Sequence, residues 1–395
     1  MTSGRAQRTF ELLSLSLICA LPFYRSIRFV TYLSLQDILV IIIFIWIVLT
    51  KFAFYRKYLV LMYLAFFITS ILVLQTLLVS DDSYGSIVNI MKCINTYVFL
   101  PLVIRYLTRE INSHKYAILS YTGSASVSSI ISLLFASPGT SSPERVSGYA
   151  GDPVIYSILL SFAVCVLLSN FPIILRMSIL LRFLLLSLLI LEILRTGSGS
   201  GLVIVLIAVI APRITPRKAK VSRDSVLVYF GTLMLFAMFW NSVFASKTKD
   251  RISTILNPRT SYSGEVTSGQ STIESRLLSI RYAMDQIRES PILGYGFSFD
   301  SQLTVLGLQP HNYFVLAWLT GGAILLICTI LLSLKFSKVA VLSYFRGNTL
   351  TFTVLAGGLF ALMTQPFLWD TGFFTPLFLM ASLNTFISQV EKNKD

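Results

Sequence analysis

The most constraining feature of the sequence is a series of apolar runs, each about 20 residues long, separated by short polar segments. A run of this length forms a helix that crosses a hydrocarbon core of roughly 30 Å. The 395-residue chain is 55% hydrophobic and only 13% charged, which is more apolar surface than a soluble domain of this size can bury. The sequence therefore predicts an all-α, polytopic integral membrane protein.

The apolar runs predict about 12 transmembrane helices within a single transmembrane domain over residues 1–395. The first and eighth runs are short, so tilted or re-entrant segments remain open there. Arg5 and Arg8 precede the first run, as in a secretory signal, but no small-residue cleavage site follows, so we expect this helix to be retained. The predicted spans are 10–23, 34–50, 58–79, 87–107, 116–136, 153–170, 173–194, 198–212, 225–245, 312–334, 349–365 and 372–389.

The basic residues orient these spans. With a cytoplasmic N-terminus, the predicted cytoplasmic segments hold 20 basic residues, and the short outer loops hold only Arg25, Arg28, Arg145 and Arg195. Loops that stay in the cytoplasm carry this excess of Lys and Arg, which also accounts for the net charge of +14. We therefore predict that both termini lie in the cytoplasm and that one long loop over residues 246–310 is extracytoplasmic.

That loop contains a predicted amphipathic helix over residues 271–289. Ser271 and Glu274 have the spacing of a capping box, and the Ser-Pro at 290–291 ends the helix. Apolar residues recur at helical spacing and predict one buried stripe. Its members are Ile273, Leu277, Ile280, Met284 and Ile287.

Four arginines are predicted on the outer face: Arg145, Arg195, Arg276 and Arg281. A guanidinium group binds phosphate oxygens through two parallel hydrogen bonds and stays charged at any relevant pH. The arginines thus form a candidate site for a lipid diphosphate. Pairing with Glu144, Glu192, Glu274 or phospholipid headgroups is the alternative, and Glu192 lies three residues before Arg195 on one predicted helix.

His311 is one of only two histidines and lies at the outer end of the span over 312–334. A neutral imidazole can accept a proton from a sugar hydroxyl as that oxygen attacks. The alternative is a histidine that only holds the end of a helix. The neighbouring arginines favour the catalytic interpretation.

The stretch "ESRLLSIRYAMDQIRESPILGYGF", followed after a short loop by "PHNYFVLAWLTGGAILL", resembles the shared domain of O-antigen ligases and of O-antigen and exopolysaccharide polymerases. "RTGSGSGL" resembles the small-residue motif of that family, although many members have Ser/Thr-Arg where this chain has Arg195-Thr196. "RVSGYAGDPVIYS" resembles its Arg-x-x-Gly stretch. The motif-bearing region covers about residues 145–330.

The resemblance implies a GT-C-like architecture and a metal-independent glycosyltransferase without a cofactor. Such an enzyme lies in the bacterial inner (cytoplasmic) membrane and transfers a glycan from undecaprenyl diphosphate to an acceptor hydroxyl on the periplasmic face. By resemblance, His311 is the general base, Arg276 and Arg195 bind the diphosphate, and Arg281 and Arg145 are weaker candidates for the same role. We expect a polymerase, whose acceptor is another lipid-linked glycan. A ligase, whose acceptor is the lipid A core, is the alternative, and a chain-length regulator is a candidate partner.

Other function classes are less well supported by the sequence. A metal-dependent glycosyltransferase would need outer-loop carboxylates such as Asp81 and Asp82, and a lipid-linked glycan transporter would need intramembrane charges such as Lys92 and Glu192. The four cysteines form no C-x-x-C pair and are expected to be packing residues. No zinc-finger or phosphate-loop motif is present, so no nucleic-acid partner is expected.

Overall fold

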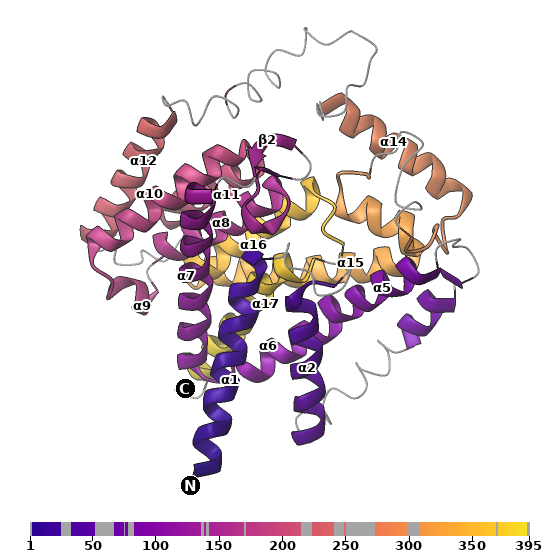
Figure 1. The fold of residues 1–395 in the computed structure, drawn as a ribbon, viewed down its shortest axis with the longest axis horizontal. Helices are drawn as coiled ribbons and strands as arrows, with labels where there is room; N and C mark the ends of the chain where they lie inside the picture. The colour runs from indigo at the N-terminus through magenta and orange to yellow at the C-terminus, as the bar shows by residue number, and fades with distance from the viewer. Residues whose placement is uncertain are drawn as a thin grey trace.

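The computed structural model describes residues 2–24, 33–51, 67–74, 76–77, 83–135, 138–139, 142–169, 171–214, 223–240, 249, 273–298, 309–368 and 370–392. These residues form helices and one short antiparallel hairpin (Figure 1). In chain order the elements are α1 (Thr2–Ala20), η1 (Leu21–Tyr24), α2 (Leu35–Thr50), α5 (Ser83–Ile94), η2 (Asn95–Phe99), α6 (Leu100–Leu107), α7 (Ile111–Phe135), β1 (Pro138–Gly139), β2 (Ser142–Val146), η3 (Gly148–Ala150), α8 (Pro153–Leu168), α9 (Pro172–Leu175), α10 (Ile179–Thr196), α11 (Gly199–Ile214), α12 (Arg223–Trp240), α14 (Ile273–Glu289), α15 (Tyr313–Phe345), α16 (Thr349–Thr364) and α17 (Thr371–Lys392).

The described part of the chain has four helices that are long and apolar enough to cross a membrane. Five shorter apolar helices accompany them. The prediction of a helical, multi-pass membrane protein is confirmed at this level, and the count of about 12 spans stays a prediction. Residues 58–66, 75, 78 and 79 of the predicted span over 58–79 lie outside the described residues. The four long helices are Tyr84–Leu107, Ile111–Phe135, Tyr313–Phe345 and Thr371–Val390.

Two predicted spans differ from the helices that form. The run over 173–194 is divided between α9 and α10, because the hydroxyl of Ser178 accepts a hydrogen bond from the Leu181 amide at 3.3 Å and starts a new helix. The run over 312–334 belongs to α15, which continues to Phe345 and is interrupted at Gly321 and Gly322. Glycine tolerates the backbone angles of such an interruption, so a continuous apolar run conceals it.

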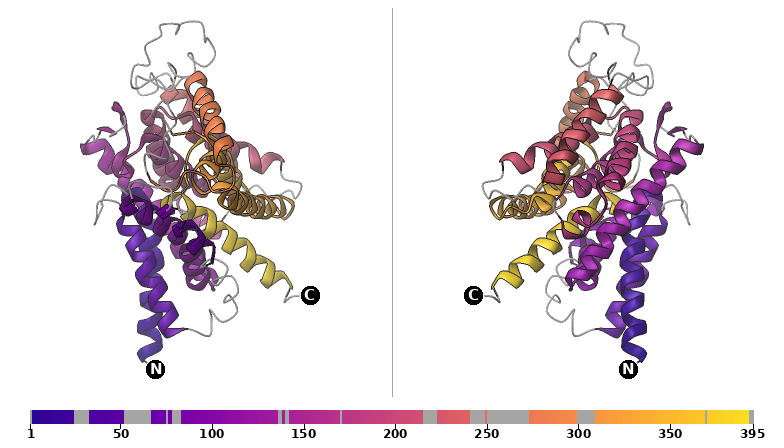
Figure 2. Two further views of the ribbon diagram at one scale, coloured as in Figure 1. Left: turned by 90° about the vertical axis from the view of Figure 1, so that its right-hand side faces the viewer. Right: turned by 90° about the vertical axis from the view of Figure 1, so that its left-hand side faces the viewer.

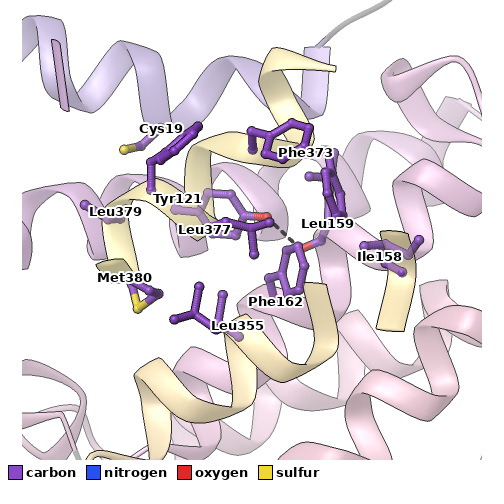
Figure 3. Close-up of a cluster of buried hydrophobic side chains, with 14 of the residues drawn as sticks. Cys19, Tyr121, Ile158, Leu159, Phe162, Leu355, Phe373, Leu377, Leu379 and Met380 are labelled. Atoms are coloured by element: carbon purple, nitrogen blue, oxygen red, sulfur yellow. Dashed lines mark hydrogen bonds between the residues drawn. The ribbon is translucent and has the colours of Figure 1, made fainter. Parts of the chain in front are cut away.

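Helix α8 forms the centre of the fold. Almost every residue from Pro153 to Leu168 is buried, and α7, α10, α11 and α16 all pack against it. A helix that is apolar on all sides is expected in such a central position. Figure 3 shows part of this core, where the hydroxyl of Tyr121 on α7 donates a hydrogen bond to the carbonyl oxygen of Leu159 at 3.0 Å.

The close packing of α11 on α8 depends on Gly201, in the motif "RTGSGSGL". A Cβ atom at Gly201 would lie 1.8 Å from Oγ of Ser157, and Oγ of Ser161 donates to the Gly201 carbonyl at 2.9 Å. Small residues let two apolar helices approach in this way within a membrane. At least this glycine of the motif therefore has a packing role.

Helix α14 and the chain termini lie at opposite ends of the molecule. In Figures 1 and 2 both termini point away from the end that carries α14. The two ends of the chain thus lie on the side away from the predicted extracytoplasmic helix, an arrangement compatible with the predicted orientation.

Candidate active site

The segment after α14 packs into the interruption of α15. Gly321 has φ −110° and ψ 15°, and Gly322 has φ 60° and ψ −158°, so the helical hydrogen bonds stop there. The amides of Tyr295 and Gly296 donate to the carbonyl oxygens of Leu319 and Thr320 at 2.8 and 2.9 Å. The loop thereby satisfies carbonyl groups that the interrupted helix leaves open, as non-helical backbone at membrane depth requires.

Helix α14 turns a small-residue face toward α15. Ser279, Ala283 and Ile287 are buried at spacings of four residues, and Ala283 and Ile287 pack against Leu319. The predicted stripe is wrong at Leu277, which is 60% exposed. Small side chains permit a closer approach to α15 than a leucine does, so α14 is rotated relative to the prediction.

Arg276 lies on the same face of α14, three residues before Ser279. Its side chain is half-buried and its Nε atom is buried. The packing of α14 on α15 therefore directs a guanidinium group toward the fold rather than toward solvent.

His311 is held between the start of α15 and the end of α16. Asn312 caps α15, and its Oδ1 atom accepts hydrogen bonds from the amides of Phe314 and Val315 at 3.0 and 3.1 Å. Its Nδ2 atom donates to the carbonyl oxygen of Met363 at 3.1 Å. One asparagine thus fixes both helix ends next to the histidine.

Burial keeps the imidazole of His311 neutral. Burial lowers its pKa to about 4, and the positive charge of Arg276 acts in the same direction. A hydrogen bond with Gln365 and the negative charge of Asp152 raise the pKa in part. Nδ1 is buried and makes no hydrogen bond to any described residue. A neutral ring with an open nitrogen can accept a proton.

Arg195 forms an ion pair with Glu192, which is fully buried and also accepts a hydrogen bond from Ser132 on α7 at 3.1 Å. This is the pairing that the sequence left as an alternative for Arg195. The cap of α10 by Gly197, with φ 63°, ends the helix directly after this arginine. The structure thus gives Arg195 a fixed position and a neutralising partner.

Among the described arginines, Arg276 is the one whose charge acts on the pKa of His311. Arg281 is exposed on α14, away from the face that packs on α15. Arg145 belongs to strand β2, which contacts α10, and its side chain lies outside the described residues. The capping box of Ser271 and Glu274 lies outside them as well.

Asp152 and Gln365 also act on His311, and neither was predicted from the sequence. Asp152 caps α8, and its Oδ1 atom accepts from the amides of Val154 and Ile155 at 2.7 and 3.0 Å. Its signal was the Asp-Pro pair before an apolar run, which is typical of a helix start. Gln365 follows α16 and gives no comparable signal in the sequence.

The site therefore combines Arg276 with the N-terminal ends of α8 and α15. The first amides of these two helices already donate to Asp152 and Asn312, so the positive charge that acts on His311 comes from Arg276. Among the described residues no group of three or more His, Cys, Asp or Glu side chains is arranged to hold a metal ion. Asp81 and Asp82 lie outside the described residues.

The comparison with known families agrees with the position of this site. The family model described as O-antigen ligase matches residues 183–330, which include Arg195, Arg276, Arg281 and His311. The chain matches no curated protein. Residues 183–330 of this multi-pass membrane protein thus match the O-antigen ligase family, and the match supports a ligase- or polymerase-type function in the synthesis of surface polysaccharides.

Proposed function

We propose that this protein transfers an oligosaccharide from undecaprenyl diphosphate to an acceptor hydroxyl on the periplasmic face of the inner membrane. The observation that carries the proposal is the position of Arg276, whose half-buried side chain acts electrostatically on the ring of His311. A base and a diphosphate-binding cation are the two groups that this reaction needs.

In the proposed reaction, the acceptor oxygen attacks the anomeric carbon of the donor sugar. The bond between that carbon and the diphosphate oxygen breaks, and undecaprenyl diphosphate leaves with the electron pair. His311 takes the proton of the acceptor hydroxyl, and Arg276 stabilises the charge that develops on the leaving diphosphate. A diphosphate whose charge is held by guanidinium groups is a good leaving group, so we expect no metal or other cofactor.

Donor binding has a second consequence for His311. The charge of Arg276 lowers the pKa of the imidazole, so an anion bound to Arg276 raises that pKa again. The ring becomes a stronger base only when the diphosphate is in place. This coupling disfavours activation of a hydroxyl before the donor has bound.

Arg195, Arg281 and Arg145 are proposed to contribute to donor binding in different ways. Arg195 lies at the end of α10, where its ion pair with Glu192 fixes the orientation of the guanidinium group. Arg281 is exposed at the surface of α14, where a headgroup or diphosphate approaching along the membrane would meet it first. Arg145 is proposed from the family resemblance alone.

We propose the polymerase reaction, in which the acceptor is the non-reducing end of another lipid-linked glycan and a chain-length regulator is a candidate partner. The ligase reaction, with the lipid A core as acceptor, is the second candidate, because the matching family model is described as O-antigen ligase.

Deletion of the gene, followed by gel electrophoresis of the surface polysaccharide, separates the two reactions. A core that carries a single repeat unit supports the polymerase. Loss of all core-attached glycan supports the ligase. An unchanged polysaccharide pattern contradicts both.

A further inference from the structure

Gln365 directly follows α16, and its amide side chain is buried near His311. Gln365 is extended, with φ −143° and ψ 149°, and only 5% of it is exposed. Its carbonyl oxygen accepts a hydrogen bond from the amide of Phe367 at 3.1 Å, which fixes the turn toward α17. A buried amide side chain needs hydrogen-bond partners, because an unsatisfied one is costly.

The polar partner that the fold offers this amide is His311. The hydrogen bond from Asn312 Nδ2 to the carbonyl oxygen of Met363, at 3.1 Å, holds the start of α15 against the end of α16. Asn312 directly follows His311, and Met363 lies two residues before Gln365. Gln365 and His311 are accordingly within hydrogen-bonding reach of each other. Two helix ends that are far apart in the sequence thus deliver one histidine and one glutamine to the same place.

We propose that Gln365 is a positioning residue for His311: its side-chain oxygen accepts the N–H of one ring nitrogen and leaves the other nitrogen open toward the acceptor hydroxyl. A neutral histidine exists as two tautomers, and a hydrogen bond to one nitrogen selects between them. The amide is uncharged, so it orients the ring without the strong rise in basicity that a carboxylate would cause. This role rests on the proposed function of His311 as the base.

The charged groups that act on the ring come from other elements. Arg276 on α14 lowers the pKa of His311, and Asp152 at the start of α8 raises it. Arg276 and Asp152 thus adjust the pKa of the imidazole, and Gln365 orients the ring. Replacing its amide by a carboxylate keeps an acceptor in place and changes that balance, which separates the two effects.

The test compares Gln365→Met and Gln365→Glu with wild type, using purified protein in detergent, undecaprenyl diphosphate-linked glycan as donor, and release of undecaprenyl diphosphate as the readout. Methionine has a similar length and no amide. We expect Gln365→Met to lower kcat by about tenfold or more, with the KM for the donor unchanged, as when the partner that orients a histidine is removed. Gln286→Met is the matched control, because the Oε1 atom of Gln286 makes no hydrogen bond to any described residue.

Gln365→Glu keeps an acceptor beside the ring and adds a negative charge. We expect it to retain activity and to move the acid limb of the pH profile upward by about one pH unit or more. Wild-type kcat in Gln365→Met together with a wild-type pH profile in Gln365→Glu would overturn the inference. If Gln365→Met does not accumulate in the membrane, the pH profile of Gln365→Glu alone decides.

His311→Ala separates this inference from the proposed function. An inactive His311→Ala variant beside unaffected Gln365 variants would refute the positioning role alone. An active His311→Ala variant would refute the proposed function, and the positioning role with it.

Discussion

Gly294 and Gly322 approach each other so closely that a Cβ atom on Gly294 would lie 2.6 Å from the amide nitrogen of Gly322. A Cβ atom on Gly322 would in turn lie 2.0 Å from the carbonyl oxygen of Ile292. Both glycines have positive φ, 70° and 60°. This contact seats the loop after α14 in the interruption of α15, and so determines where Arg276 lies relative to His311.

Gly322→Ala is expected to disrupt this contact. A methyl group at this position meets backbone atoms that cannot move aside, and positive φ adds strain. We predict a lower unfolding temperature in detergent and a loss of most transfer activity. Gly123→Ala on α7 is the matched control, because a Cβ atom there meets nothing within 4 Å. Alanine in a helix is favoured over glycine by about 0.5–1 kcal/mol, so this control should be neutral or slightly more stable. Equal behaviour of the two variants would contradict the prediction.

Arg276→Lys tests whether the site needs the guanidinium group or only a positive charge. Lysine keeps the charge and loses the planar, two-pronged geometry that matches phosphate oxygens. We predict normal expression and loss of most activity, measured as undecaprenyl diphosphate released per unit of protein. Arg288→Lys, at an exposed arginine of the same helix that pairs with Asp285, should remain active. Full activity in Arg276→Lys would indicate a non-specific charge effect.

The pH dependence should follow the lowered pKa of His311. Because its neutral form is favoured in the folded protein, the base is ready throughout the range from about pH 6 to pH 8, and kcat/KM should be flat there. The acid limb should have its midpoint at about 4, the pKa of His311 in the free enzyme. A wild-type midpoint near the ordinary histidine value of about 6.5 would contradict the burial of this ring.

Arg276→Gln should move the acid limb of that profile upward, because it removes a positive charge that lowers the pKa of His311. Arg288→Gln should leave the limb where it is. The same lowered pKa affects stability. The unfolded chain binds a proton on this histidine below about pH 6.5 and the folded protein does not, so this group contributes less to stability as the pH falls below that value.

A chelator distinguishes the proposed chemistry from a metal-dependent glycosyltransferase. Because guanidinium groups take the place of a metal in stabilising the diphosphate, we predict that EDTA leaves the rate of transfer unchanged. Loss of activity in EDTA that is restored by Mg²⁺ or Mn²⁺ would favour the metal-dependent alternative and direct attention to Asp81 and Asp82.

The sequence predicted those features of the fold that depend on composition and local pattern. Long apolar runs identified the helical membrane class, and the amphipathic pattern placed a helix where α14 forms. The rotation of α14 was not predictable from that pattern, because the packing surface is set by small residues that fit the interruption of α15. A hydropathy pattern predicts that Leu277 is buried and says little about Ala283. In the structure Ala283 is buried against α15 and Leu277 is exposed.

The site was predictable in part for a similar reason. His311 and Arg276 lie in segments with recognisable patterns, and the structure gives them an electrostatic interaction. Asp152 and Gln365 reach the same place from other helix ends, 159 residues before and 54 residues after His311. Contacts between distant helix ends depend on how the helices pack, and residue spacing predicts contacts only within one helix. The pairing of Arg195 was visible because its partner is only three residues away.

His311 is proposed as the general base, and the second histidine, His114, provides its control. Purified wild type, His311→Asn and His114→Gln would be compared for release of undecaprenyl diphosphate and for glycan transferred to the acceptor. We predict that His311→Asn folds and binds donor but loses about 10²- to 10⁴-fold in rate, the usual contribution of a general base. His114 is buried in α7 and its ring bonds to the backbone of Glu110 at 3.1 Å, so His114→Gln should keep its activity. Wild-type rates in His311→Asn would contradict the central claim.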